Sequence, residues 1–190
     1  AVDFGSFVGV NRRASATCGS RTRGLIMGGY SGSGHGVNNI DCNIFSSTGS
    51  AFDFGDLSES VRYAVGGSNS TRGIRAGGYD GSRSETIDYV TIAAEGGTAQ
   101  NFGDLVASKY IFNNGACSQT RCIFPSGYTS NWDATMEFVT TSTQGNAADF
   151  GDSTTARGYG QGLSCSATRG LFYGGDTPAD SNIIDYVTLA

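Results

Sequence analysis

The sequence repeats itself four times with a period of 48 to 50 residues, and this repeat restricts the fold more than any other feature. An arginine that follows a threonine recurs at spacings of 49, 49 and 48, at Arg23, Arg72, Arg121 and Arg169. A Phe-Gly pair recurs at spacings of 50, 48 and 48, beginning at Phe4, Phe54, Phe102 and Phe150. Periods of this length are typical of chains built from stacked supersecondary units.

Each unit is predicted to hold four short strands. In the second unit these are "RYAVGGSNS", "RGIRAGG", "ETIDYVTIA" and "AQNFGDL". The turns between them contain Asn-Ser, Asp-Gly and Gly-Gly, which bend the chain readily. No segment has a sustained apolar period of 3.6 residues, so we expect almost no helix.

The side-chain pattern of the strands predicts sheets that are covered on both faces. The third strand of the second unit, residues 87–92, is partly apolar on both faces, whereas a strand with one face in water would alternate cleanly. The first strand of each unit contains almost only small residues, which suit the crowded inner rim of a radial array. We therefore predict an all-β fold, a β-propeller of four blades.

The predicted propeller is one domain with units at approximately 7–56, 57–105, 106–152, and 153–190 plus 1–6. Residues 1–6 read as the fourth strand of a unit, and the last unit lacks one. We expect this N-terminal strand to join the last blade and to close the ring. Two alternatives stay open: a larger ring shared between chains, and a fragment of a longer array.

The segment "RGIRAGGYDGSRSETIDYVTIA" resembles the Kelch repeat, with its apolar strand, double glycine, variable loop and acid beside an aromatic residue. The chain lacks the tryptophan that usually follows the third strand of that repeat. Together with the "FGDL" that follows, the sequence of the repeat more closely resembles repeats in virion and tail-fibre proteins of tailed phages of marine bacteria. The resemblance implies a propeller and a place in a virion.

Composition and charge exclude several partners. The net charge is −5 and the chain has no cluster of Lys and Arg, so we expect no nucleic-acid partner. No apolar run approaches about 20 residues, so we expect no membrane span. No His, Cys or acidic cluster has metal-ligand or catalytic spacing, so we expect no metal, no cofactor and no enzyme activity.

The repeated arginine has a repeated acid 16 to 18 residues after it. If the connecting hairpin is centred on Asp80, the two residues face each other across it. We therefore expect structural ion pairs within or between blades, rather than a ligand site. The expected pairs are Arg23–Asp41, Arg72–Asp88, Arg121–Glu137 and Arg169–Asp185.

Cys117 and Cys122 flank the turn sequence "SQTR". A two-residue turn at 119–120 would make them a directly opposed, non-hydrogen-bonded pair with Cα atoms about 4.5 Å apart, which a disulfide accepts. The alternative is two buried thiols.

Loops between the second and third strands vary most among the units, and variable loops on a repeated scaffold are where recognition usually lies. His35, Arg83, Trp132 and Asp180 are the residues that we expect to mark this face. Trp132 is either a contact platform or a ring tucked under its loop.

We therefore expect a non-enzymatic structural or adhesive module of a virion or another extracellular assembly. Its expected partners are other assembly proteins, further copies of the chain, and a glycan or protein of a host surface. A Kelch-type interaction module and a glycan-active propeller enzyme are the two alternatives.

Overall fold

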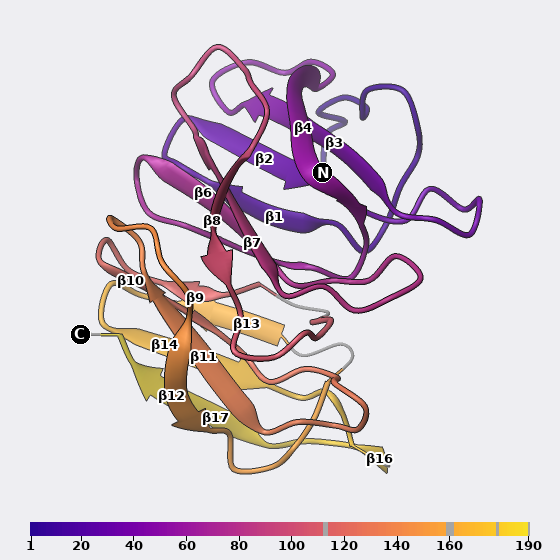
Figure 1. The fold of residues 1–190 in the computed structure, drawn as a ribbon. Coiled ribbons are helices and arrows are strands. Elements are labelled where there is room, and N and C mark those ends of the chain that lie inside the picture. Colours follow the sequence, from indigo (N-terminus) through magenta and orange to yellow (C-terminus); the bar gives the residue numbers. More distant parts are fainter. Residues whose placement is uncertain (112–113, 159–161, 178, 190) are drawn as a thin grey trace.

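The protein is an all-β, four-bladed β-propeller, which confirms the predicted fold class (Figure 1). The computed structural model describes residues 1–111, 114–158, 162–177 and 179–189. Pro178 of the fourth variable loop and Ala190 lie outside these ranges. No helix occurs in the part of the chain that the structure describes.

Three blades are four-stranded antiparallel sheets in which neighbouring strands follow one another along the chain. Blade 1 comprises β1 (Ala16–Gly19), β2 (Arg23–Met27), β3 (Val37–Ile44) and β4 (Phe52–Val61). Blade 2 comprises β5 (Val65–Ser68), β6 (Arg72–Ala76), β7 (Thr86–Thr91) and β8 (Gln100–Asp104). Blade 3 comprises β9 (Ala116–Cys117), β10 (Arg121–Phe124), β11 (Thr135–Thr140) and β12 (Ala148–Asp152).

Blade 4 has three strands in its sheet, β13 (Gly162–Cys165), β14 (Arg169–Tyr173) and β17 (Ile184–Thr188). A two-stranded hairpin of β15 (Asp176–Thr177) and β16 (Ala179–Asp180) forms its variable loop. Among the described strands, β17 pairs only with β14.

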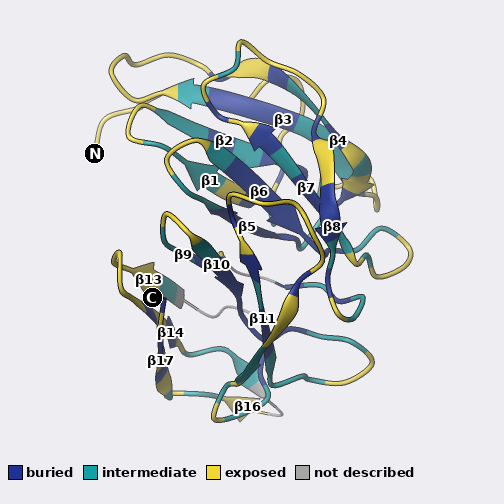
Figure 2. Cartoon of the chain, turned by 60° about the vertical axis from the view of Figure 1, so that its left-hand side comes forward, coloured by how far each residue is buried: buried dark blue, intermediate teal, exposed yellow. Residues whose placement is uncertain are grey.

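The hydrophobic core is divided among the spaces between neighbouring blades (Figure 2). Between blades 1 and 2, Leu25 and Ile40 pack with Val90 and Ile92. Equivalent clusters fill the next two junctions, with Phe124 in the second and Phe172 in the third. Sheets that bury apolar side chains on both faces explain the mixed pattern of the third strands.

The inner strands approach one another too closely for large side chains. A Cβ atom added to Gly66 on β5 would lie 2.2 Å from the backbone oxygen of Thr17 on β1. The second strand of blade 4 also lies close to the inner strand of blade 3, since a Cβ atom on Gly170 of β14 would lie 2.5 Å from the Cβ of Ala116 on β9. At the outer end of the second strand, Gly77 and Gly78 have φ of 60° and 118°, a region that favours glycine.

The turns that join the first and second strands of all four blades meet around one axis. They border a single cavity of about 400 Å³, lined by residues 19–21, 68–70, 117–119 and 165–167. The four repeats are therefore wedges around a common centre, with the inner strands β1, β5, β9 and β13 side by side in chain order.

The expected pairing of residues 1–6 with the last blade is not formed. The backbone oxygens of Phe4 and Ser6 instead accept hydrogen bonds from the amides of Gly49 and Ala51, at 2.7 and 2.9 Å. These amides lie in the loop between β3 and β4 of blade 1, and a backbone donor in a folded chain requires a hydrogen-bond partner. The N-terminal segment therefore lies on blade 1, and none of the strands that the structure describes pairs with the outer edge of β17.

Candidate binding face

A buried ion pair lies in every blade, but the partners differ from those predicted. The carboxylates of Asp41, Asp88, Glu137 and Asp185 are on the third strands, as expected. Their cations are Arg12 at 3.0 Å, Arg75, Lys109 at 2.6 Å and Arg157 at 2.8 Å, respectively. All four cationic side chains are fully buried. The four predicted ion pairs are therefore wrong, namely Arg23–Asp41, Arg72–Asp88, Arg121–Glu137 and Arg169–Asp185.

The predicted partners were wrong because the hairpin is not centred on the residue that the prediction used. Arg72 faces Thr91 and Asp88 faces Arg75, so the hairpin is centred between residues 81 and 82 rather than on Asp80. Inside the hairpin, Tyr79 and Arg83 form an isolated bridge, and the midpoint of this pair is residue 81, half a residue from the midpoint of the paired strands. The loop is therefore asymmetric, and a midpoint taken from the Asp-Gly dipeptide gives the wrong register.

Two of the repeated arginines, Arg23 and Arg72, join neighbouring blades instead. The Nη1 atom of Arg23 donates to the backbone oxygen of Ile92, and Arg72 donates in the same way to Thr141, both at 2.9 Å. Three of the four guanidinium groups also stack on the aromatic residue of the adjacent third strand, at 4.5 to 4.7 Å from the ring centre. These are Arg72 on Tyr89, Arg121 on Phe138 and Arg169 on Tyr186.

Each buried carboxylate also fixes the segment that enters its blade. It accepts a hydrogen bond from a backbone amide three residues after a Phe-Gly pair. The donors are Val8 to Asp41 at 3.1 Å, Ser58 to Asp88 at 3.2 Å, Val106 to Glu137 at 2.7 Å and Thr154 to Asp185 at 3.1 Å. The acids therefore act as structural anchors between consecutive blades.

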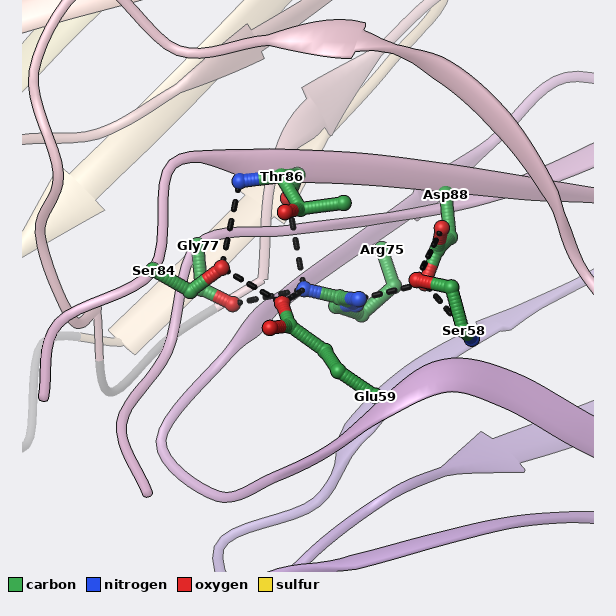
Figure 3. A network of polar contacts seen from close by, with 7 residues as sticks. All are labelled: Ser58, Glu59, Arg75, Gly77, Ser84, Thr86 and Asp88. Carbon is green, nitrogen blue, oxygen red and sulfur yellow. Dashed lines mark hydrogen bonds and ion pairs between the residues drawn. The ribbon is translucent and has the colours of Figure 1, made fainter. Parts of the chain in front are cut away.

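Blade 2 contains an extensive network of this kind (Figure 3). The guanidinium group of Arg75 contacts Asp88 and Glu59, the latter at 2.9 Å, and also donates to the backbone oxygens of Gly77 and Thr86. Ser84 donates its hydroxyl proton to the same Glu59 carboxylate. A buried charge is tolerated when it is paired and hydrogen-bonded in this way.

The four predicted loop residues lie at the outer ends of their blades, and three of them occupy the same position of the repeat. Arg83 pairs with Tyr79, Trp132 pairs with Tyr128, and Asp180 pairs with Asp176. In blade 1 the equivalent pair is Tyr30 with Gly36, so His35 is one residue away. This equivalence puts all four residues at the same end of the propeller.

Their exposure differs. The side chain of His35 is 79% exposed, with its Nδ1 atom 3.7 Å from a carboxylate oxygen of Asp80. Arg83 and Asp180 are exposed. Trp132 is half-buried and lies against the next blade, because a Cβ atom on Gly158 would be 2.3 Å from its ring. Its ring is therefore tucked against the backbone and supports the loop.

Below these loops, arginines and aromatic rings form a continuous row across blades 1 to 3, which we call the aromatic ladder. It consists of Arg13, Tyr30, Arg62, Tyr63, Tyr79, Tyr110, Tyr128 and Trp132. Arg62 lies 4.9 Å from the ring centre of Tyr30 and 5.3 Å from that of Tyr79, which joins blades 1 and 2. Tyr110 stacks on Tyr128 with 5.1 Å between ring centres.

The sequence reasoning did not identify the ladder, although Tyr30, Tyr79 and Tyr128 recur at a spacing of 49. At its blade 1 end lies a hollow of about 400 Å³, lined by Asn11, Arg12, Arg13, Tyr30, Ser31 and Gly32. Arg13 is exposed here. The ladder thus gives the variable loops a rigid base with a polar hollow at one end.

A disulfide joins Cys117 and Cys122, which are directly opposed on β9 and β10 with Cα atoms 4.0 Å apart. Cys165 is exposed, while Cys42 is buried. The thiol of Cys18 faces blade 2, where a Cβ on Gly73 would lie 2.7 Å from it. Burial raises the pKa of Cys18 to about 12, so this thiol stays protonated.

Within the described ranges, no group of three or more His, Cys, Asp or Glu side chains could hold a metal ion. The described segments also include no helix long and apolar enough to cross a membrane. Neither a protein-family model nor a curated protein matches the chain.

Proposed function

We propose that this protein is a non-enzymatic adhesive and structural module of an extracellular assembly, and that it binds through its variable loops. The resemblance of its repeats to those of phage virion and tail-fibre proteins supports a virion as that assembly. The proposed target is a glycan or protein of a host surface.

The observation that supports this proposal best is the contrast between the loops and their base. One position of the repeat carries Gly36, Arg83, Trp132 and Asp180 in the four blades. Beneath it, the repeated tyrosine is packed in each of the first three blades, Tyr30 and Tyr79 against Arg62 and Tyr128 against Tyr110. Of these varied rim residues Arg83 and Asp180 are exposed, and many repeat scaffolds present a binding surface as varied residues on a rigid frame.

The binding experiment compares wild-type protein with Arg83→Ala on an array of bacterial surface polysaccharides and on whole host cells. Because Arg83 is exposed, its removal should change the thermal midpoint little and should weaken binding at least tenfold. Arg21→Ala is the matched control, since Arg21 is an equally exposed arginine in a turn at the opposite end of blade 1.

Equal loss of binding in Arg21→Ala and Arg83→Ala would contradict a site at the loops. Binding to proteins but to no polysaccharide would favour the Kelch-type interaction module. Release of shortened glycans during the incubation would overturn the non-enzymatic assignment.

A further inference from the structure

The N-terminal segment has the contacts of a fourth strand although it pairs with no third strand. In blades 1 and 2 the backbone oxygens of Phe54 and Phe102 accept hydrogen bonds from Gly97 and Gly145 of the following blade, at 2.7 and 2.8 Å. The oxygen of Phe4 accepts the equivalent bond from Gly49 at 2.7 Å. Each of these phenylalanines belongs to a Phe-Gly pair of the repeat.

The neighbouring contacts agree with this equivalence. The carboxylate of Asp3 accepts the amide of Gly5 at 3.0 Å, as Asp53 accepts that of Gly55 at 3.0 Å. Two residues beyond each phenylalanine, the oxygens of Ser6, Asp56 and Asp104 accept amides of the following blade at 2.9, 2.7 and 2.8 Å. Residues 3–8 are thus held on blade 1 as the outer strand of a preceding blade.

Within the described residues no fourth strand lies at the outer edge of β17, and the side chains beside this edge are exposed. Ile184 is 67% exposed, whereas Ile40 and Ile87 at the same position of blades 1 and 2 are fully buried. Tyr186 is 62% exposed. An open strand edge with apolar side chains is a template for pairing with another chain.

The N-terminal segment is apolar and exposed in the same way. Phe4 is 39% exposed, while Phe54 and Phe102 are 3% and 2% exposed. Its other exposed apolar residues are Val2, Phe7, Val8 and Val10. Figures 1 and 2 place the N-terminal end beside blade 1 and the C-terminal end with blade 4, so the two edges lie on different parts of one molecule.

We propose that residues 1–6 of a second copy of this chain pair antiparallel with β17 and complete blade 4. The segment would keep its contacts with its own blade 1, so copies would join head to tail. The contact joins two different surfaces, the N-terminal segment of one copy and the edge of β17 on the next. Such head-to-tail contacts build open filaments unless the rotation between copies closes them into a ring. This proposal is independent of the ligand that the loop face binds.

The other three blades give the register of this pairing. Their third and fourth strands pair at Cys42–Phe52, Tyr89–Gln100 and Phe138–Ala148, followed by a bulge next to the buried acid. The same register opposes Tyr186 to Val2, Asp185 to Asp3 and Ile184 to Gly5. A shift of one residue would turn the side chains to the opposite face.

The first experiment measures mass by light scattering over a range of protein concentrations. We expect multiples of the 19.6 kDa chain at high concentration and the single chain on dilution. Ile184→Lys should abolish association at the same concentrations, because a lysine at the strand edge opposes pairing. Ile44→Lys is the matched control, since Ile44 is also an exposed isoleucine, 40% exposed, on a third strand that is already paired.

The second experiment tests the register by oxidising mixtures of two variants that each carry one introduced cysteine. Both carry Cys165→Ser, which removes the exposed thiol. A mixture of Val2→Cys and Tyr186→Cys chains should form a disulfide-linked pair of different chains. Asp3→Cys mixed with Tyr186→Cys should form at least tenfold less of it.

Two outcomes would overturn the proposal. One is a wild-type chain that stays at 19.6 kDa at every concentration. The other is a disulfide that forms only within single chains carrying both Val2→Cys and Tyr186→Cys, which would mean that the segment closes its own ring.

Discussion

Blade 2 differs from the other blades in the residue that supplies its buried cation. In the other three blades, the buried cation comes directly before a residue that forms an isolated bridge just beyond the end of the second strand. These cations are Arg12, Lys109 and Arg157, and the corresponding residue of blade 2 is Val61. Blade 2 instead uses Arg75, three residues after the repeated arginine. At that position the other blades have Ile26, Phe124 and Phe172. The positive charge has changed position, but the buried carboxylate has kept a partner.

This exchange predicts how the two positions respond to substitution. Arg75→Ile should lower the free energy of unfolding by about 3–5 kcal/mol, because it leaves the Asp88 carboxylate buried without a cation. The double variant Val61→Arg/Arg75→Ile should regain part of that loss, since it restores the arrangement of the other blades. Urea unfolding measures both, with Arg83→Ala as an exposed arginine control expected within about 0.5 kcal/mol of wild type. A double variant no more stable than Arg75→Ile would contradict this interpretation.

At the scale of the strand, the small residues of the inner strands are required by distance. Gly66 is an example, because its added Cβ would meet backbone atoms of Thr17, and backbone cannot move aside as a flexible side chain can. Gly66 also accepts a hydrogen bond from the amide of Gly115 at 2.6 Å. This one residue therefore touches the inner strand of blade 1 and the segment leading into the inner strand of blade 3.

Gly66→Ala should therefore lower the free energy of unfolding by about 3 kcal/mol, the upper part of the range for overpacked cores. Gly24→Ala is the control, because its Cβ would meet only the ring of Phe45, which is 54% exposed, at 3.0 Å. We expect less than about 1 kcal/mol there. Equal effects in both variants, measured by thermal unfolding, would show that spacing between inner strands does not restrict these residues.

The sequence predicted the elements well and their cross-strand partners less well. Repeat spacing, the Phe-Gly pairs and the Gly-Gly turns located the strands and the four blades, because these features are local and recur. The ion pairs depended on the centre of a loop that contains the Tyr79–Arg83 bridge and is not symmetric. The aromatic ladder joins residues of three blades, and the distances between blades are set by packing that no single repeat contains.

At the scale of the whole molecule, stability should decrease from the middle blades to blade 4. Blade 2 has a hydrophobic cluster on each side, whereas β17 has an open edge and two strongly exposed apolar side chains. In dilute protein, amides of β17 should exchange with deuterium roughly 100-fold faster than those of β7, which corresponds to an opening about 3 kcal/mol easier. Mass spectrometry of peptides resolves the two strands. Equal protection of β7 and β17 would contradict this gradient.

The hydrogen bonds that join a Phe-Gly pair to the blade after it use the same atoms of the repeat in three places, Phe4 with Gly49, Phe54 with Gly97 and Phe102 with Gly145. Recombination between two copies of the repeat, in register, would delete or insert one whole unit and leave every remaining junction matched. An out-of-register event would separate a buried acid from its backbone donor and disrupt folding. A change in length by one whole blade would thus preserve the contacts that folding needs, whereas a change by part of a blade would not.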